Sequence, residues 1–118
     1  MAVTYTTAVK TDRITATRDY FANGTLEILD GATVLATFGL SASGGTIATD
    51  TWTLVFDAST VAAGATGVAD GAQIKNSVGT AGITGLTVGT AGSDINLDNT
   101  SINSGQDVTL SSATIQHA

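Results

Sequence analysis

The spacing of apolar positions near the start of the chain predicts one α-helix. Residues 6–22 contain no glycine, and their apolar side chains recur at the helical period. The apolar stripe is formed by Tyr5, Val9, Ala16 and Tyr20, and it is widened by Ile14 and Phe21. Asn23 and Gly24 follow, and both tolerate the left-handed conformation found just after many helix ends. We therefore expect a helix over 6–22 that packs on the protein through this stripe.

After Gly24 the apolar period changes to two, which is the period of β-strands. Two strands, 25–29 and 33–40, flank the hairpin signal Asp30-Gly31, and 41–45 is expected to be a loop. The run Thr51–Phe56 is the most β-prone in the chain, so we expect a central strand there. On that strand Trp52, Leu54 and Phe56 share one face, which we expect to be buried.

The second half of the chain predicts further short strands. We interpret 58–70 as a long loop or weak strand, and 72–78 as a strand alternating around Ile74 and Val78. The segment 78–82 is repeated at 88–92, which two matched turns explain more simply than a solenoid. Ile95 and Leu97 alternate with polar residues, and 99–102 predicts a short corner or strand. In the strand 107–116 the apolar side switches near Ser111-Ser112, which predicts a β-bulge.

These patterns together predict a mainly β fold. Short strands at about ten-residue spacing, separated by glycine, asparagine, aspartate and serine, are typical of a β-sandwich or small β-barrel. We expect about seven to eight short antiparallel strands with one N-terminal α-helix. The chain of 118 residues corresponds to a single compact domain. Within it we distinguish an N-terminal arm and helix, 1–24, from a β body, 25–118.

The composition argues against several classes of function. The chain has no cysteine, so disulfide scaffolds, thiolate zinc sites and cysteine nucleophiles are excluded. A net charge of −6 argues against a nucleic-acid partner, which requires a basic surface. We expect no membrane partner, because no long apolar run and no signal-peptide pattern is present. The single histidine, His117, stands beside the last residue, so we expect no catalytic residue, no cofactor and no enzyme activity.

Two binding chemistries are considered and given little weight. Asp94, Asn96 and Asp98 have the alternating oxygen spacing of a calcium loop, but the glycine and glutamate required later in that loop are absent. Polar residues on the outer face of a strand explain the same spacing, so we expect no metal site. Saccharide binding usually needs exposed aromatic side chains, and Trp52 is expected to belong to the core.

The charges are divided unevenly along the chain. Residues 1–18 carry a net charge of +2, whereas residues 19–118 carry −8. Such an asymmetry often marks a surface that binds a partner. The bases of the first segment are Lys10, Arg13 and Arg18, and they are our candidate partner-binding residues. The alternative is that these bases lie on the solvent face of a helix and contact the acidic body of their own chain.

Short motifs near both ends of the chain resemble a known family. The chain has Thr4-Tyr5 and a basic helix spanning Lys10 to Arg18, and later Asp94-Ile95-Asn96-Leu97, Thr100-Ser101-Ile102-Asn103 and Thr114-Ile115-Gln116-His117. In these motifs it resembles a family of small proteins encoded among the structural genes of tailed bacteriophages. The resemblance covers both ends well and the middle loosely, and the chain departs from the family pattern over 41–70.

The resemblance implies a structural protein of the virion. The nearest match is a capsid decoration or cement protein, made in the host cytoplasm, that binds the outer surface of the assembled phage head and stabilises the shell. Its partners would be the major capsid protein and further copies of itself, with a trimer as the default oligomer. On this interpretation Lys10, Arg13 and Arg18 meet an acidic capsid surface. The alternative is a neck, tail or fibre component that binds another virion protein or a host surface glycan.

Overall fold

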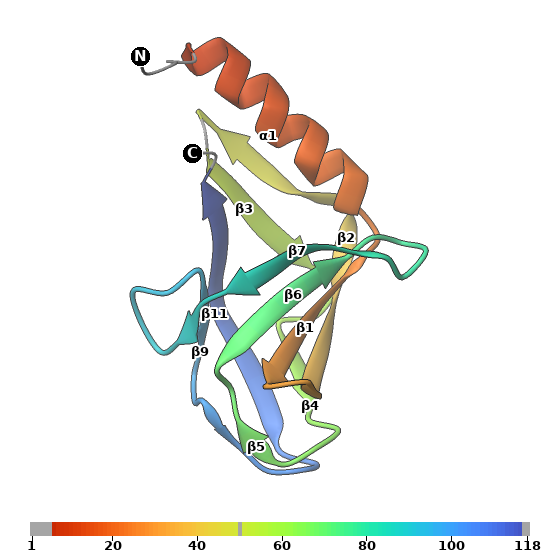
Figure 1. Cartoon of the computed structure of the whole chain (residues 1–118), viewed down its shortest axis with the longest axis vertical. Coiled ribbons are helices and arrows are strands. Elements are labelled where there is room, and N and C mark those ends of the chain that lie inside the picture. The colour runs from red at the N-terminus through yellow and green to blue at the C-terminus, as the bar shows by residue number, and fades with distance from the viewer. Residues whose placement is uncertain (1–5, 50, 117–118) are drawn as a thin grey trace.

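The computed structural model describes residues 6–49 and 51–116 (Figure 1). Three residues named above, Thr4, Tyr5 and His117, lie outside these ranges. The described part is mainly β with one helix, as expected, and its main sheet is nearly closed into a barrel. It contains eleven strands, more than the seven or eight expected, because several are only two or three residues long.

The helix α1 spans Thr7–Phe21, close to the range expected. Its N-cap is Thr6, whose Oγ1 accepts a hydrogen bond from the Val9 amide at 3.4 Å. Threonine has a modest helix propensity, but here several hydroxyls bond to the carbonyl four residues earlier. The three threonines that do so are Thr11, Thr15 and Thr17. The predicted stop is confirmed, because Asn23 takes a left-handed φ of 63° directly after the helix.

The helix buries a different face from the one expected. Its buried side chains are Ile14 and Phe21, whereas Val9 and Tyr20 are 41% and 57% exposed and Ala16 is also exposed. The direction of the stripe was therefore wrong. Val9, Ala16 and Tyr20 do share one side of the helix, but that side is exposed, whereas Ile14 and Phe21, which were expected only to widen the stripe, form the buried side. Periodicity identifies which side chains lie together, but not which side is covered. Phe21 and Ile14 are covered because α1 packs over β2 and β3.

The strands follow the chain in the order labelled in Figure 1. They are β1 (Thr25–Asp30), β2 (Thr33–Ala48), β3 (Thr51–Phe56), β4 (Thr60–Ala62), β5 (Gly67–Val68), β6 (Gly71–Lys75), β7 (Ala81–Leu86), β8 (Val88–Gly89), β9 (Ile95–Leu97), β10 (Ser101–Ile102) and β11 (Asp107–Gln116). The main sheet has the order β7-β6-β1-β2-β3-β11-β9-β8, with β4 paired to β11 outside this path. β5 and β10 form a separate two-stranded sheet.

The two ends of the main sheet are consecutive in the chain. β7 ends at Leu86 and β8 begins at Val88, so one residue, Thr87, joins the first and last strands of the path. The Thr87 amide and hydroxyl both donate to Oδ2 of Asp94, at 3.1 and 3.2 Å. β8 pairs with β9 in parallel, which departs from the all-antiparallel expectation. The chain itself, through Thr87, therefore joins β7 to β8, the two strands at the ends of the hydrogen-bonded path.

The segment 41–45 is not a loop, because β2 continues through it as one long strand with an irregular register. Gly44 and Gly45 both have positive φ, and a Cβ added at Gly45 would lie 2.1 Å from the Thr53 carbonyl oxygen. The indole Nε1 of Trp52 donates to the Gly44 carbonyl at 2.9 Å. Glycines here mark a bulge and a close approach of two strands, which sequence reasoning took for a break between strands.

The core is aliphatic, with few aromatic residues. β3 lies between β2 and β11, which confirms it as a central strand. Trp52 is fully buried, Leu54 is buried and Phe56 is half-buried on the same face. The remaining fully buried large side chains are Phe38, Leu26, Ile28, Leu35, Leu40, Ile74, Ile95, Leu97, Ile102 and Val108. Val78 was expected to alternate into a strand but lies in the turn after β6, 83% exposed.

The predicted bulge in β11 is confirmed. The register of β11 against β9 shifts between Leu110 and Ser112. As a result Val108 is buried before the shift and Ala113 after it, although their positions differ by an odd number. β11 pairs with β3 and β9 in the main sheet and with β4 beside it, so the strand runs through the middle of the barrel wall.

Candidate docking surface on the N-terminal helix

The helix α1 is attached to the barrel mainly through its last turn. There the ring of Phe21 is stacked on Trp52, with centroids 6.3 Å apart and planes 20° from parallel. Tyr20 meets Phe21 edge to face at 4.8 Å. About two turns earlier, Ile14 is buried, and nearer the start of the helix the Thr11 hydroxyl donates to the Thr49 carbonyl. The inner face of α1 therefore packs against the barrel, and the other sides of the helix are exposed.

The outer side of α1 divides into two stripes of different character. Val9, Arg13, Ala16 and Tyr20 follow the spacing that places residues on one side of a helix, and all four are exposed; we call them the outer stripe. The stripe that runs through Ala8, Asp12 and Asp19 holds the acidic residues of the helix. One outer side of α1 is thus apolar with a single base, and the other is acidic.

The three candidate bases do not lie together on one face. Arg18 is half-buried on the side facing β2; its Nη2 lies 3.0 Å from Asp19 Oδ1, and its Nη1 lies 3.5 Å from the Gly45 carbonyl. Lys10 is also half-buried on the inner side of the helix. Arg13 is exposed and belongs to the outer stripe. Arg18 therefore contacts its own chain closely, and Arg13 is the most exposed of the three bases.

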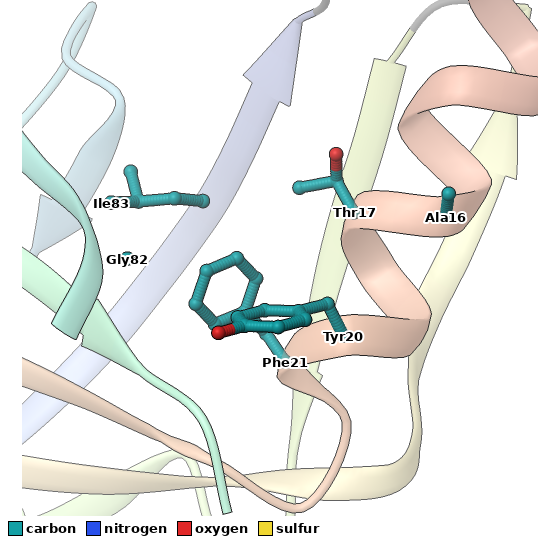
Figure 2. Close-up of a pocket in the computed structure, with 6 residues that line it drawn as sticks. All are labelled: Ala16, Thr17, Tyr20, Phe21, Gly82 and Ile83. Carbon is teal, nitrogen blue, oxygen red and sulfur yellow. The ribbon is translucent and has the colours of Figure 1, made fainter. Parts of the chain in front are cut away.

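A groove of about 590 Å3 runs between α1 and β7 beside the outer stripe. Its lining residues are Ala16, Thr17, Tyr20 and Phe21 from α1, with Gly82 and Ile83 from β7 (Figure 2). We call it the α1–β7 groove. In Figure 2 Ile83 points into the gap from the strand side, and the two aromatic rings reach across from the helix at one end. No lining residue carries a charge.

The wall on the β7 side depends on a glycine. A Cβ added at Gly82 would lie 2.5 Å from Cζ of Phe21 and 2.9 Å from its Cε1, so the ring occupies the space that a side chain would need. The pairing of β7 with β6 is irregular on both sides of Ile83, which lets Gly82 and Ile83 line the same groove. Sequence reasoning missed these two residues, because no periodic pattern links β7 to a helix sixty positions earlier.

The calcium-like residues have local structural roles. One carboxylate oxygen of Asp94 accepts two hydrogen bonds from Thr87, and Oδ1 of Asp98 accepts from the Thr109 amide at 3.2 Å. The Asn96 amide group is bonded to Ser93 and to Ser112. Among the described residues, no group of three or more histidine, cysteine, aspartate or glutamate side chains is placed to hold a metal ion.

The described helix is neither long nor apolar enough to cross a membrane.

Comparisons with protein-family models, with curated proteins and with solved structures each gave no match for this chain.

Proposed function

We propose that this protein is a structural component of a tailed-bacteriophage virion that binds the assembled head and stabilises its shell. The observation that carries the proposal is the outer stripe of α1, an exposed apolar surface with one base, on a helix packed against the β body. The sequence motifs at both ends of the chain support the same class of protein, since they resemble small phage structural proteins.

A decoration protein acts through surface contact, which suits this chain. The carboxylates of Asp94 and Asp98 are hydrogen-bonded within the fold, and the chain's exposed apolar side chains include Val9 and Tyr20 on one side of α1. Binding to the assembled shell but not to its separated subunits stabilises the shell by mass action. Repeated identical sites add avidity if the protein bridges neighbouring subunits. The outer stripe would supply buried apolar area, and Arg13 would supply attraction to an acidic capsid surface.

The roles of the three bases follow from their places in the fold. Arg13 is the base that we assign to direct docking, because it is exposed beside the apolar residues of the stripe. Lys10 and Arg18 are half-buried, and Arg18 is paired with Asp19, so we assign them a smaller part in docking. An exposed charge is screened by salt, so the contribution of Arg13 should shrink as ionic strength rises.

Cryo-electron microscopy of the source particle tests the proposed location. Density for this protein spread over the capsid surface supports a decoration protein, whereas density confined to the neck, tail or fibres supports the alternative component and refutes decoration. Absence from purified virions refutes both.

A charge-matched pair of variants tests the docking residue. Arg13→Gln and Asn103→Asp each change the net charge by one unit in the same direction, but Asn103 follows β10, which pairs with β5 at the end of the fold opposite α1 (Figure 1). We expect Arg13→Gln to lower capsid occupancy at sub-saturating protein and low salt, measured by gel densitometry, while Asn103→Asp retains full occupancy. Equal occupancy for both variants and the parent protein would show that Arg13 does not dock.

A further inference from the structure

We infer that Asn23-Gly24, directly after α1, is a deamidation site that the docked helix protects and that, once it has reacted, keeps the helix from docking again. The modification is spontaneous and consumes only water, so it goes beyond the proposed function and does not depend on it. The reacting groups are the side-chain amide of Asn23 and the backbone nitrogen of Gly24.

The reaction joins two groups of adjacent residues. The backbone nitrogen of Gly24 attacks Cγ of Asn23; a C–N bond forms, the bond from Cγ to the amide nitrogen breaks, and ammonia leaves with the proton that the attacking nitrogen loses. Water then opens the cyclic imide at either carbonyl, which gives aspartate or isoaspartate. Glycine favours the attack because it has no Cβ to hinder its nitrogen, and Asn23 is the only asparagine in the chain that precedes glycine.

Three backbone hydrogen bonds hold this dipeptide in the folded protein. The nitrogen of Gly24 donates to the Phe21 carbonyl at 2.8 Å, and the Gly24 carbonyl accepts from the Leu40 nitrogen at 2.9 Å. The nitrogen of Asn23 donates to the Ser41 carbonyl at 3.2 Å. The bond to Phe21 protects most directly, because a neutral carbonyl oxygen accepts a hydrogen bond but does not remove the proton that the attacking nitrogen must lose.

Gly24 also has no room to turn towards the side chain of Asn23. It is buried, and a Cβ added to it would collide with the Lys75 carbonyl oxygen and lie 3.0 Å from Cα of Asn76. The backbone of Gly24 is therefore packed against the end of β6. The side chain of Asn23, by contrast, is exposed and makes no hydrogen bond to the residues that the structure describes. The glycine, and not the asparagine, restricts the reaction.

Opening of α1 would remove the main restraint. The carbonyl that holds the Gly24 nitrogen belongs to Phe21, the last residue of α1, so unwinding of the last helical turn breaks that bond. The helix contacts the sheet mainly at β2 and β3 and takes no part in strand pairing, so it can open while the sheet stays paired. Local openings cost less free energy than global unfolding and are populated in native proteins. Deamidation should therefore proceed through opening of α1.

Isoaspartate in place of Asn23 would prevent α1 from docking again. The main chain of isoaspartate runs through Cβ and Cγ, so it is longer by a methylene group between the helix end and Gly24. The packing of Gly24 against the Phe21 and Lys75 carbonyls leaves no space for this group. The ring of Phe21 would then lose its stacked position on Trp52.

A pair of valine variants tests the protection by α1. Ile14→Val removes one methyl group from the buried side of α1, and Ile102→Val removes the same group from β10, which pairs with β5. Loss of one methyl group is tolerated in a core, so both variants should fold. In neutral buffer we expect Ile14→Val to speed deamidation of Asn23 about three- to tenfold and Ile102→Val to leave the rate unchanged.

Mass spectrometry of proteolytic peptides measures these rates, and the parent protein in guanidinium supplies the rate of the unprotected chain. We expect Asn23 to react at least about tenfold more slowly in the native parent protein than in guanidinium. Equal rates in the native and denatured protein would overturn the inference, because the fold would then give no protection. Equal acceleration by the two valine variants, or acceleration by neither, would also overturn it.

The isolated product tests the second step. The isoaspartate form is separated by chromatography and compared with Asn23→Asp, which has the same charge without the added methylene group. Aspartate tolerates the left-handed φ of 63° found here, so Asn23→Asp should fold like the parent protein. We expect the emission of Trp52 to move to longer wavelength in the isoaspartate form and to stay unchanged in Asn23→Asp. Parent-like emission of the isoaspartate form, or an equal shift in Asn23→Asp, would overturn the inference.

Discussion

Gly82→Ala should destabilise the parent protein, but it should be neutral or stabilising in a variant in which Phe21 is replaced by leucine. In the parent protein the new Cβ would lie 2.5 Å from Cζ of Phe21, closer than real Cβ contacts occur. The ring cannot withdraw freely, because it is packed in the core against Trp52. Overpacking of this kind costs about 1–3 kcal/mol. Gly82 does not have a positive φ, so the backbone itself should accept alanine.

The variant Phe21→Leu removes the atoms that would clash. Leucine lacks the Cε1 and Cζ positions that lie nearest to the added Cβ, although the variant by itself should cost about 1–3 kcal/mol through lost packing. In that background Gly82→Ala should be neutral or should stabilise by about 0.4–1 kcal/mol, because alanine restricts the unfolded chain. The double-mutant cycle should therefore give a coupling energy of about 1–3 kcal/mol between the two positions.

Guanidinium unfolding followed by fluorescence measures each corner of this cycle. Trp52 is the only tryptophan and is fully buried, so its emission should change sharply on unfolding. Gly64→Ala is the matched control, because a Cβ there meets nothing within 4 Å and its φ is not positive. Gly82→Ala behaving like Gly64→Ala, or costing the same in both backgrounds, would refute the packing of α1 against β7 described here.

Three further substitutions probe other parts of the fold. Trp52→Phe leaves the buried Gly44 carbonyl without its donor and should cost about 2–4 kcal/mol, measured by circular dichroism during denaturation. Asp94→Ala removes the acceptor for the Thr87 amide; it should cost about 1–2 kcal/mol and speed hydrogen exchange at that amide. Val78→Thr, in an exposed turn, should change stability by less than about 0.5 kcal/mol, and a larger loss would mean that the valine is packed.

The sequence was sufficient wherever a single segment determines the outcome. The apolar positions change from the even-numbered Val108 and Leu110 to the odd-numbered Ala113 and Ile115, which predicted the side switch in β11 and hence its bulge, because strand faces follow from chain parity alone. The β-branched and aromatic run of β3 indicated a central strand for a similar reason. The helix end at Asn23 was also local, since it depends on one left-handed residue.

The sequence was insufficient where distant segments meet. Spacing grouped Val9, Ala16 and Tyr20 correctly, but only the position of β2 and β3 determines that this side of α1 faces outward. The glycines of 41–45 were interpreted as a loop because the strand that approaches them, β3, was not yet placed. The α1–β7 groove was missed for the same reason, since its two walls come from segments with no common pattern. Of the candidate bases, Arg13 is the one that remains exposed.

The position of β11 determines when the barrel of a newly synthesised chain can close. The last ten described residues form this strand, yet its partners β3, β4 and β9 are all made earlier. The hairpin of β1 and β2 can pair while translation continues, but the wall between β3 and β9 stays open until β11 leaves the ribosome. A chain truncated before β11 would expose the edges of both strands and become a substrate for proteases. Folding of the barrel is therefore cooperative over the whole described sheet, because its two halves are joined through the strand that is made last.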